Sequence, residues 1–121
     1  MSEHNLHIID VKTLQDAKKA IMEIGSDPQS IDIMAPKAIS KVIKLENVIL
    51  QDAIIIKQDM LSIGGEVAVP KNTFDLHKET GEILIIGTLK QLNELIDKLN
   101  RHYSRLKDIA KELEILLKEV N

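Results

Sequence analysis

The sequence predicts an α/β fold: a small sheet of about four or five strands with covering helices and a long C-terminal helix or helical hairpin. Three observations indicate this fold. Short β-branched runs precede amphipathic stretches, two of those stretches open with a capping-box sequence, and the last third carries a heptad repeat. A chain of 121 residues has the length of one domain. We therefore expect a single domain, with an α/β core at residues 1–88 and a helical segment at residues 89–121.

The first unit is a strand followed by a helix. Residues 6–11 (LHIIDV) are short and rich in β-branched side chains, which is typical of a strand. Thr13 and Asp16 form a capping box, and apolar residues three and four apart continue from there as one helical stripe. Gly25 is the expected left-handed end of this helix, and Asp27-Pro28 follows as a turn.

The next stretch leaves more than one interpretation open. Residues 31–35 alternate apolar and polar positions and suggest a short strand, which Pro36 would end or confine to an edge. Residues 39–45 fit either a second strand or a helical turn leading to one. Asn47 is a credible N-cap for a long apolar helix over residues 48–63, whose apolar face is broad enough for burial on more than one side.

The following segment predicts two more strands. Gly64-Gly65 would end the preceding helix, and residues 66–70 fit a strand of four or five residues. Residues 71–81 are polar and loop-like. Residues 83–86 are entirely apolar, as in the middle of a parallel sheet that is covered on both faces.

The last third has the clearest periodicity. Thr88 and Gln91 form a second capping box, and no Gly or Pro occurs from Leu89 to the end. Apolar residues then recur every seventh position in two series, one from Leu92 and one from Ile96. One helix of about 32 residues, roughly 48 Å long, and two helices that fold back on each other at Ser104 are both compatible with this pattern. Of the two we expect the single helix. It would overhang a small domain and assemble a homodimer, or bind a partner protein, through Leu92, Ile96, Leu99, Tyr103, Leu106, Leu113 and Leu117.

Composition excludes several classes of function. Aromatic residues are only 2% of the chain and its formal net charge is −3, so the sequence offers neither a basic surface nor stacking groups for nucleic acid. No apolar run approaches the ~18 residues of a membrane span, and the polar N-terminus does not fit a signal peptide. The chain has no cysteine. We expect a cytoplasmic protein with an aliphatic core.

The sequence contains no recognisable catalytic or metal signature. His4, His7, His77 and His102 lack metal-ligand spacing, and neither nucleophile motifs nor glycine-rich phosphate loops occur. We expect no cofactor. We expect a binding site for an anion or another small molecule, if the chain has one, at the strand ends. The polar candidates there are Lys37, Lys57, Gln58, Glu66, Thr88 and Lys90. The alternative is that Thr88 only caps a helix and that Lys57 is a solvated side chain on an apolar helix.

Several blocks resemble the N-terminal extension of a subfamily of dihydropteroate synthases, enzymes of pterin biosynthesis. The most specific block is KQDMLS at residues 57–62, and the similarity spans about residues 5 to 100. The catalytic barrel of that family needs ~250 residues, so the resemblance implies a stand-alone extension without the barrel. Glu66 precedes Val67-Ala68-Val69 rather than the Ser-Thr-Arg-Pro of the barrel motif, so no catalytic role transfers to it. The family's Pro-Phe-Gly turn is replaced by HYSR at residues 102–105, which favours a continuous helix.

Two functional hypotheses follow. The first is a non-catalytic accessory domain that assembles with itself or with a pterin-pathway protein. The alternative is a domain that binds or converts a pterin-like molecule or an anion at the strand ends. The scarcity of aromatic side chains favours the first, because a flat pterin ring usually stacks on such groups.

Overall fold

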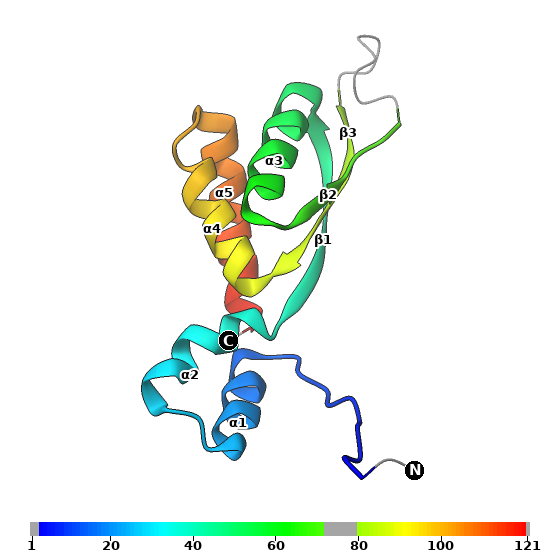
Figure 1. Cartoon of the computed structure of the whole chain (residues 1–121). Helices are drawn as coiled ribbons and strands as arrows, with labels where there is room; N and C mark the ends of the chain where they lie inside the picture. The colour runs from blue at the N-terminus through cyan, green and yellow to red at the C-terminus, as the bar shows by residue number, and fades with distance from the viewer. Residues whose placement is uncertain (1–2, 72–79, 121) are drawn as a thin grey trace.

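The computed structural model describes residues 3–71 and 80–120 and is a mixed α/β structure with a three-stranded sheet (Figure 1). The elements follow in the order α1 (Leu14–Ile24), α2 (Pro28–Met34), the 3-10 helix η1 (Ala35–Lys37), β1 (Ser40–Ile49), α3 (Leu50–Ile63), β2 (Glu66–Ala68), β3 (Thr80–Thr88), α4 (Leu89–Leu99), α5 (Ser104–Leu117) and the 3-10 helix η2 (Lys118–Val120).

The sheet is antiparallel, with strand order β1-β3-β2. The apolar segment 83–86 lies in its central strand, where Ile85 faces Ile43 of β1 and Val67 of β2. The predicted four or five strands are not confirmed, because the described residues form three. These strands are antiparallel, not parallel as the apolar run at residues 83–86 suggested. Two predicted strands, residues 6–11 and 31–35, do not join the sheet.

One face of the sheet is covered and the other is open. Helices α3, α4 and α5 all lie on the same side in Figure 1. Side chains of β3 alternate accordingly: Ile83 and Ile85 are buried, whereas Ile86 is 38% exposed. Val42, the cross-strand neighbour of Ile86, is 64% exposed. The unbroken apolar run in β3 therefore does not report burial on both faces.

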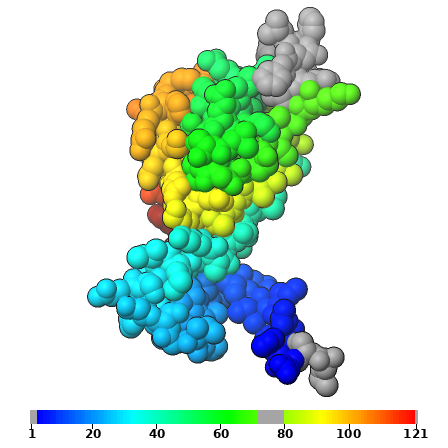
Figure 2. Space-filling model, in the orientation of Figure 1, coloured from blue at the N-terminus to red at the C-terminus, as the bar shows by residue number. Residues whose placement is uncertain are grey.

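Helices α1 and α2 form a small lobe at the foot of the sheet (Figures 1 and 2). The Thr13 capping box and the left-handed Gly25, with φ 85°, are confirmed. Asp27-Pro28 is not a free turn, because the Asp27 side chain accepts from the backbone N–H of Gln29 (3.0 Å) and caps α2. This cap and the proline at the first helical position favour a helix over the predicted strand at residues 31–35.

Strand β1 runs further than the sequence suggests. Asn47 is not an N-cap: it has a left-handed backbone (φ 57°) inside a register shift between Leu45 and Val48, and the strand continues to Ile49. Helix α3 therefore begins at Leu50. Asparagine tolerates left-handed φ better than most residues with a side chain. Asn47 therefore fits the irregular position in the strand, and it does not cap a helix. Gly64, with φ 103°, ends α3 as predicted.

The C-terminal third is a helical hairpin, so the expected single long helix is wrong. Helix α4 ends at Leu99 and α5 begins at Ser104, after a short turn whose N–H groups bond back to α4. Because the chain folds back, the two heptad series pack against each other, against α3 and against the sheet within one chain. A straight helix of that length could bury its apolar residues only with a partner. The Thr88 capping box at the start of α4 is confirmed.

The core is aliphatic and includes one tightly packed point between two glycines. Met60 is fully buried, and a methyl group added at either Gly65 or Gly87 would overlap its Cε atom. At Gly65 the added group would also lie 3.0 Å from the carbonyl oxygen of Ile86. The predicted loop at residues 71–81, with Phe74 and His77, lies largely outside the described residues.

We expect Gly65→Ala to lower the free energy of unfolding by about 1–3 kcal/mol, because the added methyl meets the Ile86 carbonyl oxygen as well as Met60, and a backbone atom cannot rotate away. Urea unfolding followed by circular dichroism measures the loss. Gly25→Ala is the contrasting variant: its methyl meets nothing within 4 Å, and it should cost only the roughly 1–2 kcal/mol of a left-handed backbone. A Gly65→Ala protein as stable as the wild type would contradict the tight packing at Met60 and Ile86.

Candidate functional site

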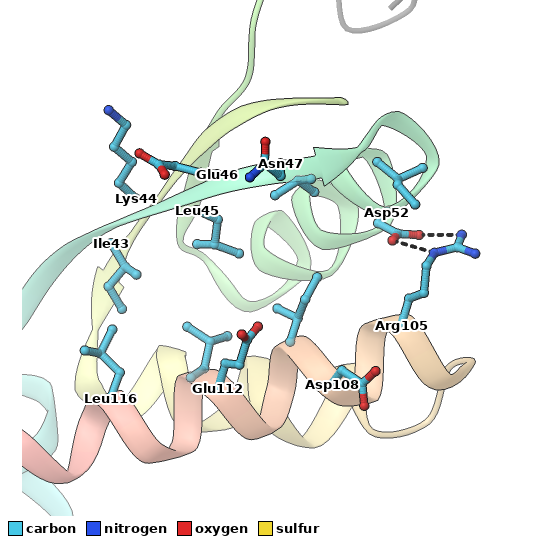
Figure 3. A pocket seen from close by; sticks show the side chains of 14 residues that line it. Ile43, Lys44, Leu45, Glu46, Asn47, Asp52, Arg105, Asp108, Glu112 and Leu116 are labelled. Carbon is cyan, nitrogen blue, oxygen red and sulfur yellow. Dashed lines mark hydrogen bonds and ion pairs between the residues drawn. The ribbon is translucent and has the colours of Figure 1, made fainter. Parts of the chain in front are cut away.

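A groove lies between strand β1 and helix α5 on the described surface (Figure 3). Its volume is about 430 Å³, within the size range of ligand pockets. One wall is the backbone and side chains of residues 43–49, at the edge of the sheet. The opposite wall is α5, and Asp52 closes one end. The lining residues are Ile43, Lys44, Leu45, Glu46, Asn47, Val48, Ile49, Asp52, Arg105, Asp108, Ile109, Glu112, Leu113 and Leu116.

Helix α5 has two apolar stripes, one facing the protein interior and one facing the groove. Leu106, Ala110, Leu113 and Leu117 are buried in the interior. Ile109 and Leu116, seven residues apart, are only partly covered and form the floor of the groove together with Leu113. Leu116 is 41% exposed. The groove is therefore a place where apolar side chains are reachable from outside.

A buried carboxylate, Asp52, lies at one end of the groove. Its side chain is only 3% exposed, and it accepts two hydrogen bonds from Arg105, Nε to Oδ2 at 2.9 Å and Nη2 to Oδ1 at 3.0 Å. The hydroxyl of Tyr103 donates a third, short bond to Oδ1. The guanidinium also lies 4.8 Å from the centre of the Tyr103 ring, in cation–π contact.

These contacts keep Asp52 ionised. Burial alone would raise the pKa of Asp52, but the hydrogen bonds from Arg105 and Tyr103 and the positive charge of Arg105 outweigh it and hold the pKa below its usual value. Burial and the bond to Asp52 raise the pKa of the Tyr103 hydroxyl. A carboxylate with a lowered pKa and all these donors is a poor general base. The cluster instead joins α3 to the start of α5.

A second contact reinforces this joint. Asp59 lies seven residues after Asp52 on α3, and its Oδ2 is 2.9 Å from Nε2 of His102. Both acids thus bind side chains from the segment that links α4 to α5. The position of the hairpin turn is set by these tertiary contacts as well as by the local sequence.

The free edge of β1 forms the other wall of the groove. Strand β1 is at the edge of the sheet and pairs only with β3 among the described strands. In an antiparallel ladder, every second residue of an edge strand turns its N–H and C=O away from its neighbour. The groove therefore combines unpaired backbone groups with an aliphatic floor.

The six residues predicted for a ligand do not converge on this groove, since none of them lines it. Lys57 and Glu66 do lie together: Lys57 Nζ is 3.4 Å from Glu66 Oε1 and donates to the carbonyl of Val67 at 2.7 Å. The hydrogen bond from the backbone of Val67, then the bond and charge of Lys57, lower the pKa of Glu66.

The other four predicted ligand residues are spread over the surface. Thr88 serves the capping box of α4 with Gln91. Lys90 pairs with Glu94 along that helix. Gln58 is exposed on α3 and Lys37 is exposed in η1. Thr88 and Lys90 therefore serve the local structure of α4. Of the six candidates, the two side chains that contact each other are Lys57 and Glu66.

The heptad residues predicted for an oligomer interface lie inside the chain. Six of the seven are buried, and Tyr103, at 37% exposed, contacts Asp52 and Arg105. The helical hairpin satisfies the heptad pattern internally, so a contact surface for another protein has to lie elsewhere. The buried heptad residues are Leu92, Ile96, Leu99, Leu106, Leu113 and Leu117.

Sequence reasoning missed Asp52, Arg105 and the groove itself. A weak signal for Asp52 was present, because it is a carboxylate in the first turn of an otherwise apolar helix. In the part of the chain that the structure describes, no group of three His, Cys, Asp or Glu side chains is arranged to hold a metal ion. None of the described helices has the length and apolar character to span a membrane.

The fold and groove define a mixed α/β domain with an exposed sheet edge. The chain is similar to the bifunctional dihydropteroate synthase/dihydropteroate reductase of Helicobacter pylori (strain ATCC 700392 / 26695), with 32% identity over 101 residues. The match covers 84% of this chain but 27% of the relative, so the chain spans about a quarter of the length of the curated relative it matches.

This finding supports the resemblance to dihydropteroate synthase extensions in its coarser form: the chain is related to part of a dihydropteroate synthase protein. No protein-family profile matches the chain. A search of solved structures finds no significant match either.

Proposed function

We propose that this chain is a non-catalytic accessory domain of the pterin pathway and acts by contact with a protein partner in the β1–α5 groove. The relation to the pathway rests on the similarity to the Helicobacter pylori enzyme, whose name gives synthase and reductase activities. Because the match covers about a quarter of that enzyme, an accessory role for this part is the simpler assignment.

The observation that carries the proposal is the chemistry of the groove. Proteins bind an extended peptide as an added strand through a strand edge with free backbone groups and nearby pockets for its side chains. The groove combines such an edge with an aliphatic floor. The charged groups at its end, Asp52 and Arg105, are bound to each other. A peptide backbone would find donors and acceptors along β1, whereas the carboxylates of Glu46, Asp108 and Glu112 in the lining disfavour an anionic small molecule.

A second candidate function is favoured by one observation, the pairing of Lys57 with Glu66 at the start of β2. A cation and a carboxylate that lie together at a strand end could recognise a small polar ring such as a pterin by hydrogen bonds. Both side chains are already partnered, however, and both are more than a third exposed. We therefore give this site second place.

Thermal unfolding with pterins and inorganic phosphate separates the two functions. An accessory domain should show no saturable rise in Tm with any of these molecules. Lys57→Ala should itself change stability by less than about 1 kcal/mol, because an exposed ion pair contributes little. Saturable stabilisation by a pterin that disappears in Lys57→Ala would overturn the accessory function and support the second candidate.

A further inference from the structure

The described surface contains an apolar segment that has the sequence of a strand but no sheet to join. We call this segment, residues 6–10, the arm. Leu6 is 80% exposed, Ile8 99% and Ile9 56%. Soluble proteins rarely leave neighbouring large aliphatic side chains this exposed unless a partner covers them. In Figures 1 and 2 the arm projects from the α1–α2 lobe.

We propose that the arm of one copy of this chain adds as a fourth strand to the free edge of β1 in a second copy, with its apolar side chains in the groove. This inference deepens the proposed function and rests on it, because it names the partner that the groove receives. The exchange would be reciprocal, so each of two copies donates one arm and accepts one, as in a symmetric dimer.

The arm is long enough to cover five of the seven β1 residues that line the groove, and its aliphatic side chains suit the groove floor. Five extended residues span about 17 Å at roughly 3.4 Å per residue, and the groove follows seven residues of β1, 43–49. The arm brings Leu6 and Ile8 on one face and Ile9 on the other. The face with two aliphatic side chains, Leu6 and Ile8, meets the floor formed by Ile109, Leu113 and Leu116, and Ile9 faces the open side of the sheet.

A second copy, rather than the same chain, is the occupant because the root of the arm is held in a fixed direction. The backbone N–H groups of Lys12 and Thr13 both donate to Asp16 Oδ2 at 3.2 Å. The carbonyl of Lys12 accepts from Nζ of Lys41 at 3.4 Å, and Val11 packs against the core. From this root the arm runs away from α5 of its own chain (Figure 1).

Sedimentation velocity of the 121-residue chain and its variants tests the exchange. The wild type should sediment as a dimer, at twice the 13.6 kDa of one chain. Ile8→Asp in the arm and Leu116→Asp in the groove should each raise the dimer dissociation constant at least roughly tenfold, because each would bury a carboxylate without a partner. Ile115→Asp is the matched control: this neighbour on α5 is 59% exposed and does not line the groove.

Mixing provides a readout that a merely structural role would not give. The Ile8→Asp chain keeps an intact groove and the Leu116→Asp chain keeps an intact arm, so an equimolar mixture should restore one of the two contacts. The mixture should therefore dimerise at lower concentration than either variant alone. Circular dichroism melts of both variants confirm folding, which exposed positions should preserve.

Two results would overturn the exchange. One is a wild-type chain that stays at 13.6 kDa at all concentrations, including the case in which the arm closes on its own groove. The other is a dimer that Ile8→Asp leaves intact. Neither result concerns pterin binding, so the proposed function stands or fails separately in the thermal unfolding test.

Discussion

Ile85→Ala is expected to lower the free energy of unfolding by about 2–5 kcal/mol, the cost of removing a large aliphatic side chain from a packed core. Ile85 is fully buried at the centre of the covered sheet face, between Ile43 of β1 and Val67 of β2. Urea unfolding at neutral pH measures the change in midpoint.

Ile86→Ala is the matched control, because Ile86 is the next residue of the same strand and faces the open side at 38% exposure. Its loss should cost less than about 1 kcal/mol, in proportion to the smaller area it removes from water. Equal losses at both positions would show that the second sheet face is also covered in solution, contrary to the one-sided sheet described here.

Arg105→Leu is expected to lower the free energy of unfolding at pH 7, because it leaves the carboxylate of Asp52 without its cation. Breaking a buried ion pair leaves an uncompensated charge, and here Asp52 would keep only the Tyr103 hydroxyl as donor. The loss is at the lower end for such pairs because the Arg105 side chain itself is 50% exposed. Arg101→Leu, at an exposed arginine in the same turn, should change stability little.

The same cluster makes the difference between wild type and Arg105→Leu depend on pH. The pKa of Asp52 is lowered in the folded chain, so its contribution is present above the unfolded value near 3.9 and is lost as the pH falls through the folded pKa. In Arg105→Leu the buried carboxyl has lost its cation and its pKa rises. Urea unfolding should show the two proteins converging as the pH falls below about 4. A difference that stays constant down to pH 3 would mean that Asp52 and Arg105 do not form the pair described here.

The parts of the fold that depend on neighbouring residues could be predicted from the sequence. The capping boxes at Thr13 and Thr88 and the glycine ends at Gly25 and Gly64 work within a few residues, and each was found where the sequence placed it. The central strand at residues 83–86 also stood out. The number of strands that pair with it and their direction could not be predicted, because both depend on contacts between distant segments.

The errors have a common physical cause, which is that one local pattern serves two tertiary arrangements. A heptad repeat fits a long helix with a partner as well as a hairpin that buries its own repeat, and the choice here depends on Asp52 and Asp59 binding residues 102–105. The site shows the same limit. The sequence makes Lys57 and Glu66 candidate ligand residues, and the two side chains do lie together. The groove could not be predicted in this way, because it forms between β1 and α5, which are far apart in the sequence.

The arm illustrates the opposite case, in which a pattern was present without its expected structure. Residues 6–11 have the composition of a strand, yet they pair with no strand among the described residues. β-propensity measures how well side chains fit a half-buried sheet surface. Such a segment therefore needs a sheet edge, and the exposed edge of β1 supplies one that a second copy can fill.

Amide hydrogen exchange at residues 43–49 of β1, resolved by NMR, tests most directly whether the groove receives a protein strand or a small molecule. If a strand occupies the edge, alternate amides along β1 should become protected as the concentration of the chain rises, and adding a pterin should leave that protection unchanged. Protection that responds to a pterin and not to protein concentration would contradict the role of the groove as a protein-contact surface.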